Sequence, residues 1–169
     1  MKGPSYVCNE IARDEDPSYV EFELKTDLLA YFAPEEFAGR RILDFGCGSG
    51  ASTMILHRLF PSAEIIGVEL DPDLLAIARK RAEHYSFPQA NLVQSPAGTD
   101  LPSDLGEFDF VIMSAVVEHL LPKERAVVLP KLWNLIRDGG FRVMEMDTMY
   151  LPGTPHFAGF NYWGSAAKA

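Results

Sequence analysis

A turn with three glycines at alternate positions holds the residues of this chain best suited to binding a ligand. Residues 42–45 form a short apolar run, Gly46, Gly48 and Gly50 follow it, and residues 51–60 then place apolar residues at helical spacing. A strand, a glycine turn and a helix in this order open many nucleotide-binding α/β sites. Glycine lets the backbone turn sharply and lets a ligand approach where a Cβ atom would collide. The helix that follows presents free N–H groups to that ligand.

An acid beside the turn helps to decide which ligand fits. Gly46, Gly48 and Ala51 match the dinucleotide pattern G-x-G-x-x-G/A, whereas Gly46, Gly48 and Gly50 match G-x-G-x-G. Asp44 lies two residues before the first glycine, where its carboxylate would repel a pyrophosphate and attract a positive charge. The turn therefore favours a positively charged ligand. A glycine turn that binds nothing is the structural alternative.

The wider pattern predicts an α/β fold in which strands alternate with helices. Apolar runs predict five strands, at residues 42–45, 64–69, 91–94, 108–114 and 141–146. Periodic apolar residues predict helices at residues 21–32, 51–60, 72–88 and 122–138. Asp71 is the expected N-cap of the third helix, and Pro130 is expected to kink or split the last one.

Alternating strands and helices of this length imply a doubly wound, mostly parallel sheet with helices on both faces. Ligands of such sheets bind at the carboxyl ends of the strands. Four polar residues lie at or just after those ends: Asp44, Glu69, Ser114 and Asp147.

The string Leu-Asp-Phe-Gly-Cys-Gly-Ser-Gly at residues 43–50 resembles motif I of the class I S-adenosylmethionine-dependent methyltransferases. The resemblance covers roughly residues 37–150. It implies a Rossmann-like fold and S-adenosyl-L-methionine as the cofactor, whose ammonium and sulfonium suit an acid at this place. It also implies that the turn lies beneath the methionine part of the cofactor, with Gly46, Cys47, Gly48 and Gly50 in the cofactor site. Asp44 is then the acid that takes up the methionine ammonium.

The second strand ends in an acid that suits a ribose. The resemblance implies that Glu69 accepts both ribose hydroxyls, with Leu70 beside it in the cofactor site. A carboxylate offers two oxygens to a vicinal diol, which agrees with that role. Because an acid here also suits a dinucleotide enzyme, Glu69 indicates nucleoside binding more firmly than one particular cofactor.

The segment after the third strand departs from the family pattern. Relatives often have an acid there that meets the adenine amino group, but Pro96 occupies the expected place. The alternatives are backbone groups near Ala97, the Ser95 hydroxyl, or Asp100. Asp100 also fits a plain turn residue in a Gly-Thr-Asp loop, which is the favoured interpretation.

Residues 114–120 read Ser-Ala-Val-Val-Glu-His-Leu and resemble the V-L-E-H-L signature of small-molecule methyltransferases. The resemblance implies that Ser114 borders the cofactor and that Glu118 and His119 lie near the transferred methyl group. A histidine with a reference pKa of about 6.5 suits removal of a proton from an acceptor hydroxyl. The alternative is a pair that caps or packs the loop. Some relatives bind magnesium through E-x-x-E-H, but Ala115 replaces the first acid, so we expect no metal.

The end of the chain, residues 148–169, is rich in aromatic residues, glycine and proline. In the family the corresponding segment often forms part of the acceptor pocket, and aromatic rings attract a sulfonium. Packing on the core is the alternative. The expected organisation is therefore an arm at 1–20, a methyltransferase domain at 21–147 and an aromatic tail at 148–169.

Composition narrows the expected partners. The 169 residues carry a formal net charge of −9 and a pI of about 4.8, so nucleic acid is not an expected partner. No apolar run reaches the length of a membrane span, and the first residues lack a signal-peptide pattern. Two cysteines form no disulfide framework, so a reduced, cytoplasmic protein is expected.

These observations predict a methyltransferase that acts on oxygen, nitrogen or carbon of a small-molecule acceptor. The alternatives are a non-catalytic methyltransferase-like binding module and an NAD(P)-dependent oxidoreductase, although the Tyr-x-x-x-Lys pair of many such oxidoreductases is absent. The sheet is expected to lack the last strands of the usual seven. Either a homodimer or the tail would then cover its fifth strand.

Overall fold

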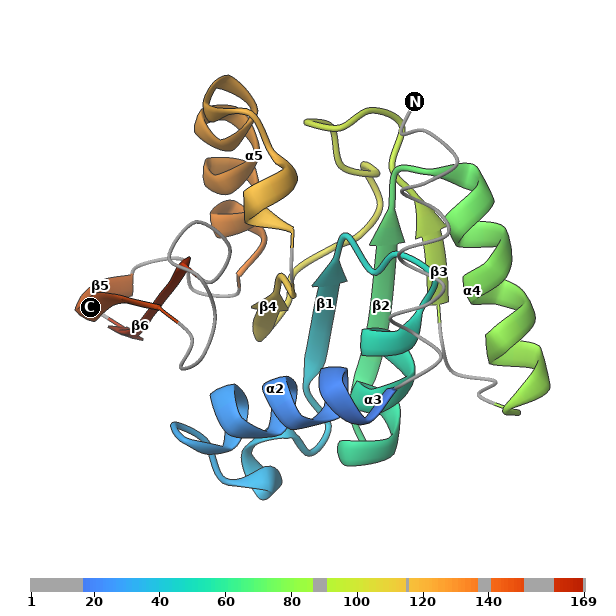
Figure 1. Cartoon of the computed structure of the whole chain (residues 1–169), viewed down its shortest axis with the longest axis horizontal. Helices are drawn as coiled ribbons and strands as arrows, with labels where there is room; N and C mark the ends of the chain where they lie inside the picture. Colours follow the sequence, from blue (N-terminus) through green and yellow to red (C-terminus); the bar gives the residue numbers. More distant parts are fainter. Residues whose placement is uncertain (1–16, 87–90, 115, 137–140, 151–159, 169) are drawn as a thin grey trace. The chain divides into compact units, whose positions relative to one another are not determined.

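The computed structural model describes residues 17–86, 91–114, 116–136, 141–150 and 160–168 (Figure 1). The chain divides into two compact units, residues 1–137 and residues 138–169. The expected boundary between domain and tail at residue 147 stays a prediction.

The first unit contains a four-stranded parallel sheet. Its strands are β1 (Arg41–Phe45), β2 (Glu64–Glu69), β3 (Asn91–Gln94) and β4 (Phe110–Ile112), in the order β3-β2-β1-β4. Leu43 lies opposite Ile66 of β2 and Val111 of β4. β1 and β2 are buried on both sides, as their continuous apolar sequences require. The parallel order confirms the predicted fold class, although β4 is shorter than residues 108–114.

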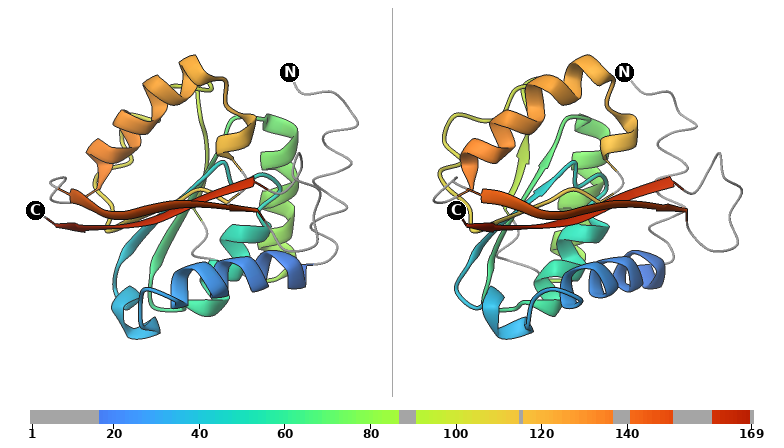
Figure 2. Two further views of the ribbon diagram at one scale, coloured as in Figure 1. Left: turned by 60° about the vertical axis from the view of Figure 1, so that its left-hand side comes forward. Right: turned by 90° about the vertical axis from the view of Figure 1, so that its left-hand side faces the viewer.

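Helices cover both faces of this sheet (Figure 2). One face of the sheet is covered by α2 (Pro17–Leu29), η1 (Pro34–Phe37) and α3 (Ala51–Leu59). On the other face α5 (Pro122–Leu135) buries Val128 and Leu132 against Leu43 and Val68. α4 (Pro72–His84) packs along β2 and β3.

Two local predictions about helices have clear outcomes. Asp71 is the N-cap of α4, because its carboxylate accepts from the N–H groups of Asp73 at 2.9 Å and Leu74 at 3.4 Å. Pro130 does not split α5, which runs as one helix from Pro122 to Leu135.

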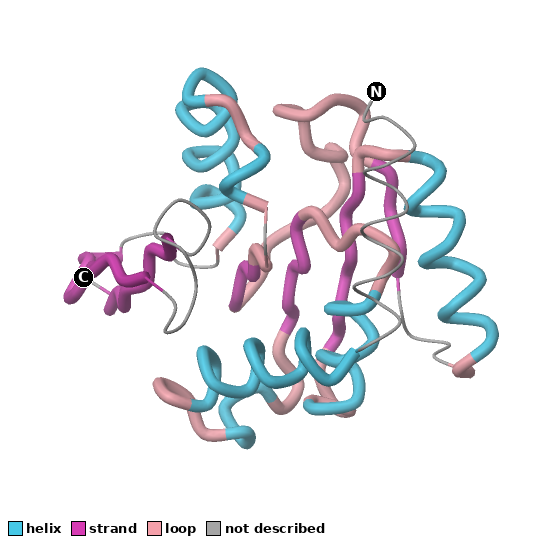
Figure 3. Tube along the Cα trace, viewed as in Figure 1, coloured by secondary structure: helices cyan, strands magenta, loops and turns pink. Residues whose placement is uncertain are grey.

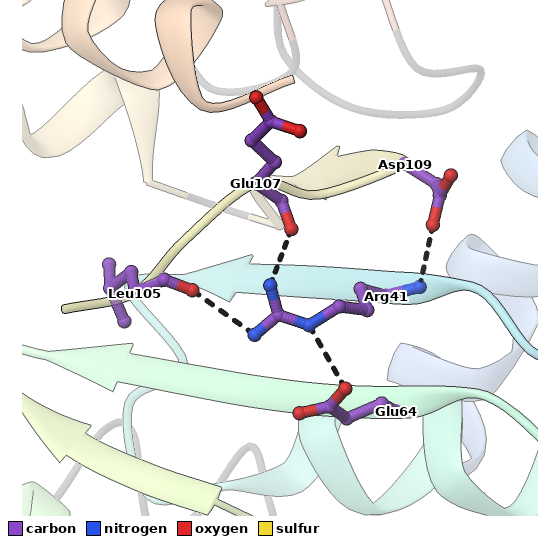
Figure 4. Close-up of polar contacts among 5 residues, drawn as sticks. All are labelled: Arg41, Glu64, Leu105, Glu107 and Asp109. Carbon is purple, nitrogen blue, oxygen red and sulfur yellow. Dashed lines mark hydrogen bonds and ion pairs between the residues drawn. The ribbon is translucent and has the colours of Figure 1, made fainter. Parts of the chain in front are cut away.

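An arginine ties together the amino ends of three strands (Figure 4). The Arg41 guanidinium donates to Glu64 Oε2 at 2.9 Å, to the Leu105 carbonyl at 3.1 Å and to the Glu107 carbonyl. The Arg41 backbone N–H donates to Asp109 Oδ2 at 2.9 Å. The loop before β4 is therefore held against β1 and β2 at the end opposite the glycine turn.

The second unit differs from the predicted fifth strand. β5 (Phe141–Tyr150) pairs antiparallel with β6 (Phe160–Lys168) in a separate two-stranded sheet. The prediction that the fifth strand joins the parallel sheet is wrong in this structure. Of the two expected ways to cover that strand, a homodimer or the tail, the structure shows the tail pairing with it. The tail contains Phe160, Tyr162 and Trp163, residue types that favour strands, and β6 supplies hydrogen-bond partners for the β5 backbone.

Among the described residues, no helix has the length and apolar character needed to cross a membrane.

Candidate cofactor site

The glycine turn is the loop that follows β1 at the carboxyl end of the strand (Figure 3), and there the N–H groups of Gly46 and Cys47 donate to the Val68 carbonyl of β2. All three glycines adopt left-handed backbone angles: φ is +76° at Gly46, +58° at Gly48 and +89° at Gly50. Residues with a Cβ atom rarely adopt these angles, so the turn requires glycine at each place. Gly50 is also the N-cap position of α3.

The room beside two of these glycines is taken up by the protein itself. A Cβ atom on Gly46 would lie 2.6 Å from Val116 Cγ2, and one on Gly50 would lie 2.9 Å from Ala78 Cβ in α4. At these positions glycine allows close packing of the turn against the loop after β4 and against α4. The motif therefore needs glycine for packing within the protein as well as for the expected approach of a ligand.

Glu69 connects the turn to the start of α4. Its Oε2 accepts from the Gly48 N–H at 2.9 Å, and its Oε1 accepts from the N–H groups of Leu70 and Asp71, each at 2.8 Å. The side chain is buried, whereas Leu70 beside it is 45% exposed. Three N–H donors keep the carboxylate in one orientation and leave it room to accept from a further donor.

Asp44 is a buried carboxylate with only one satisfied oxygen. Its residue is 1% exposed, and Oδ2 accepts from the hydroxyls of Ser52 at 2.7 Å and Thr53 at 2.6 Å. Oδ1 has no partner among the described residues. Burial raises the pKa of Asp44 to about 6, the bonds from Thr53 and Ser52 lower it, and the nearby Glu69 charge raises it.

Cys47 fills the underside of the turn. It is buried, and burial raises the pKa of its thiol well above the ordinary value, with the charges of Asp44 and Glu69 adding to the effect. A Cβ atom on Gly67 of β2 would lie 3.0 Å from Cys47 Sγ and 2.9 Å from Thr53 Oγ1. The thiol is therefore a packing group enclosed between the turn and β2.

The loop after β3 is closed by its own hydrogen bonds. The buried Ser95 hydroxyl donates to the Ala97 carbonyl at 2.8 Å and contacts the Asp100 carbonyl, and the Asp100 N–H donates to the Ala97 carbonyl at 3.1 Å. The Asp100 carboxylate accepts from Lys131 Nζ at 2.7 Å. These contacts agree with a turn role for Asp100.

This loop borders the exposed side chain that follows Glu69. A Cβ atom on Gly98 would lie 3.5 Å from Leu70 Cδ2, so Leu70 and the loop are neighbours. Ala97 is partly exposed. Leu70 and Ala97 therefore form the two accessible members of the predicted set on this side of the turn.

The segment after β4 contains the predicted catalytic pair. Ser114 is partly exposed, and a short helical turn, η2 (Val117–His119), holds His119 at the surface. The His119 N–H donates to the Val116 carbonyl at 3.0 Å. The side chain of Glu118 lies outside the described residues. The catalytic roles of Glu118 and His119 stay predictions.

The charges of the site fit a positively charged ligand. Asp44 and Glu69 are both buried around the turn, and within the described ranges neither forms an ion pair with a basic side chain. A ligand that brings positive charge would lower the cost of burying two carboxylates together. No group of three or more His, Cys, Asp or Glu side chains in the described part of the chain is arranged to hold a metal ion.

Comparison with known proteins identifies the family. The methyltransferase domain family matches residues 42–140, more than half of the chain. The chain belongs to this family. A trans-aconitate 2-methyltransferase of Afipia carboxidovorans is 44% identical over 122 residues, which cover 71% of this chain and 43% of the relative. A second, of Methylobacterium radiotolerans, is 34% identical over 109 residues, covering 64% of this chain and 38% of the relative.

Solved structures confirm the Rossmann-like fold of the methyltransferase family. Magnesium protoporphyrin IX methyltransferase from Synechocystis PCC 6803 with bound SAM has a TM-score of 0.64 at 16% identity, covering 100% of this chain and 86% of that one. PKMT2 from Rickettsia typhi in complex with AdoHcy has a TM-score of 0.54 at 22% identity. The match covers 68% of this chain and 22% of PKMT2. The chain spans about two fifths of the length of the curated relatives named above.

Sequence reasoning missed three residues that this methyltransferase domain brings to the turn. The hydroxyls of Ser52 and Thr53 donate to the Asp44 carboxylate. Two hydroxyl residues in the first helical turn after the acid and the glycines could have predicted these hydrogen bonds. Val116 packs on Gly46 from a loop 70 positions later, and no local pattern marks that contact.

Proposed function

We propose that this chain carries the cofactor site of an S-adenosylmethionine-dependent methyltransferase whose acceptor is a small carboxylic acid of the trans-aconitate type. The observation that carries the cofactor assignment is the pair of buried carboxylates around the glycine turn, Asp44 and Glu69, neither of which forms an ion pair with a basic side chain that the structure describes. The acceptor class rests on the two relatives, both named trans-aconitate 2-methyltransferase. When bound, S-adenosylmethionine supplies a methyl group made electrophilic by its sulfonium.

Each side of the site has a proposed task. Glu69, held by three N–H groups, accepts from the ribose hydroxyls. Leu70 and Ala97 enclose the adenine, since both are accessible and adjoin the same loop. Asp44 is too buried for solvent to reach, so its charge acts on the cofactor ammonium through a medium of low dielectric constant.

A carboxylic acid acceptor changes the task of His119. Carboxyl groups ionise near pH 4, so at neutral pH such an acceptor has no proton for a base to remove. We therefore propose that His119 orients the acceptor, with its imidazole donating a hydrogen bond to the acceptor carboxylate, and that Glu118 lies near the transferred methyl group. For a hydroxyl acceptor, His119 would instead act as the base.

The first experiment measures binding by calorimetry. The chain is expected to bind S-adenosylhomocysteine and not NAD. NAD binding without a response to S-adenosylhomocysteine would contradict the proposal in favour of an oxidoreductase.

The second experiment measures methyl transfer by mass spectrometry, with trans-aconitate and with a hydroxyl analogue of similar size. A methyl ester of trans-aconitate is expected. His119→Gln, which keeps a donor, should retain most turnover with the acid, whereas His119→Ala should lower it. Cofactor binding without transfer to any acid would support a non-catalytic binding module instead.

The expectations about partners and location are also proposals. We propose that two copies associate through β4, which pairs only with β1 within the described part of the parallel sheet. The net charge of −9 supports the absence of nucleic acid, and the buried free thiol of Cys47 supports a reducing cytoplasmic location.

A further inference from the structure

Within the glycine turn, Gly46 is the residue most open to a ligand. Among residues 46–50, Gly46 is partly exposed, whereas Cys47, Gly48, Ser49 and Gly50 are buried. A ligand that approaches the turn therefore meets it at Gly46. The groups that border Gly46 decide what kind of ligand surface can lie there.

Among the described residues that are not adjacent to Gly46 in the sequence, Val116 lies nearest to the place that a Cβ atom on Gly46 would occupy. A Cβ atom on Gly46 would lie 2.6 Å from Val116 Cγ2 and 3.1 Å from Val116 Cγ1, and its three nearest neighbours would all be atoms of this side chain. The two residues are thus in direct contact, and no ligand atom fits between them. A ligand at Gly46 must lie alongside the valine.

Part of the Val116 side chain remains available for such a contact. The residue packs against the core cluster of Leu43 and Phe45, yet it is only partly buried. Its surface is aliphatic, because valine carries two methyl groups and no polar atom. An aliphatic segment of a ligand is therefore the complementary partner.

We propose that Val116 is a cofactor-binding residue whose exposed side forms the wall along which the aliphatic amino-acid chain of the cofactor lies at Gly46. This inference rests on the proposed function, which places the methionine part at the turn. The nucleoside part lies with Glu69, Leu70 and Ala97, so Val116 discriminates at the amino-acid end alone.

A pair of ligands tests this division. S-Adenosylhomocysteine carries the amino-acid chain, whereas 5′-methylthioadenosine keeps the nucleoside and the sulfur and lacks that chain. In calorimetry with the full chain, Val116→Ala should weaken S-adenosylhomocysteine about three- to tenfold, because two methyl contacts are lost. Its affinity for 5′-methylthioadenosine should stay unchanged.

Val111→Ala is the matched control. Val111 packs against the same core cluster as Val116, but it lies within β4 opposite Leu43. Its truncation removes the same two methyl groups and should lower thermal stability while leaving both affinities unchanged. If Val116→Ala does not fold, Val116→Thr keeps the shape of the side chain, and the same selective loss is expected from its hydroxyl.

Three results would overturn the inference: equal losses for both ligands, an unchanged affinity for S-adenosylhomocysteine, or a tighter one. Equal losses would make Val116 a structural support of the whole site, and tighter binding would make it an obstacle. Failure of the unchanged chain to bind either ligand would instead contradict the proposed function.

Discussion

At the scale of single residues, Asp44 shows how burial and charge oppose each other in this site. The hydroxyls of Ser52 and Thr53 stabilise its ionised form, but burial outweighs them and raises the pKa from 3.8 to about 6. The carboxyl therefore takes up a proton in the folded chain more readily than in the unfolded one. Its charge is retained at neutral pH at a cost in stability.

This balance predicts a stability difference that depends on pH. Between pH 3.8 and about 6 the folded state binds more protons at Asp44 than the unfolded state, so this group's contribution to stability falls as pH rises through that window. Relative to Asp44→Asn, the wild-type chain should therefore lose on the order of 1–3 kcal/mol between pH 4.5 and pH 7. Urea denaturation of both chains measures the difference.

Ser52→Ala supplies the control for this prediction. It removes one of the hydrogen bonds that lower the pKa of Asp44, so the pH-dependent loss should grow in that variant. A difference between wild type and Asp44→Asn that does not change with pH would show that Asp44 titrates normally.

A comparison of Gly39 with Gly50 distinguishes two costs of replacing glycine, backbone strain and lack of space for a Cβ atom. Gly39 and Gly50 both have positive φ, at +69° and +89°, but a Cβ atom on Gly39 meets nothing within 4 Å, whereas one on Gly50 meets Ala78 Cβ at 2.9 Å. Gly39→Ala should cost about 1–2 kcal/mol of unfolding free energy through backbone strain alone.

Gly50→Ala should cost clearly more than Gly39→Ala, because α4 must shift away from the turn. Thermal or urea unfolding of the two variants provides the comparison. Equal costs would mean that α4 adjusts freely, and the packing explanation for the third glycine of the motif would then be wrong.

At the scale of elements, the Arg41 side chain is the main polar link between the loop before β4 and the two central strands. It donates to Leu105, Glu107 and Glu64, and its guanidinium carbon lies 4.7 Å from the centre of the Phe108 ring. Arginine suits this place because its planar group presents several donors in fixed directions, whereas lysine has one ammonium.

We expect Arg41→Ala to lower the free energy of unfolding by about 1–3 kcal/mol, because two carbonyls lose their donor. Glu64→Ala removes only the half-exposed partner and should cost at most about 1 kcal/mol. Urea denaturation of both variants gives the comparison. Equal effects would show that the ion pair, and not the carbonyl contacts, supplies the stability.

At the scale of the whole molecule, the side of β4 that faces away from β1 determines whether the proposed association occurs. The Asp109 N–H donates to the Arg41 carbonyl, so by strand alternation the N–H groups of Phe110 and Ile112 face away from β1. On this side the Phe108 N–H, directly before β4, already donates to the Leu135 carbonyl, and the donors of Phe110 and Ile112 would favour pairing with a further strand.

If two copies pair through β4, the amide hydrogens of Phe110 and Ile112 should exchange more slowly as protein concentration rises. The Val111 amide, which faces β1, should show no such dependence. Hydrogen exchange combined with sedimentation velocity provides the test. A monomer at all concentrations, with fast exchange at Phe110 and Ile112, would contradict the dimer.

Local sequence patterns determined much of this fold. The runs at 42–45, 64–69 and 91–94 predicted three strands to within one residue, and Asp71-Pro72 located the start of α4. These features depend on neighbours along the chain, namely apolar runs and a capping side chain, so they can be read without a structure. The glycine turn and its two acids were predicted for the same reason.

Other features depended on contacts between distant segments. The pairing of β5 with β6, the contact of Val116 with Gly46 and the bond from the Gly48 N–H to Glu69 each join residues that no local pattern connects. The sequence alone determined that an acid, a glycine turn and a second acid occur in order along alternating strands and helices. Only the tertiary structure decided which partners hold these acids and what fills the space beside each glycine, because both are set by segments brought together in folding.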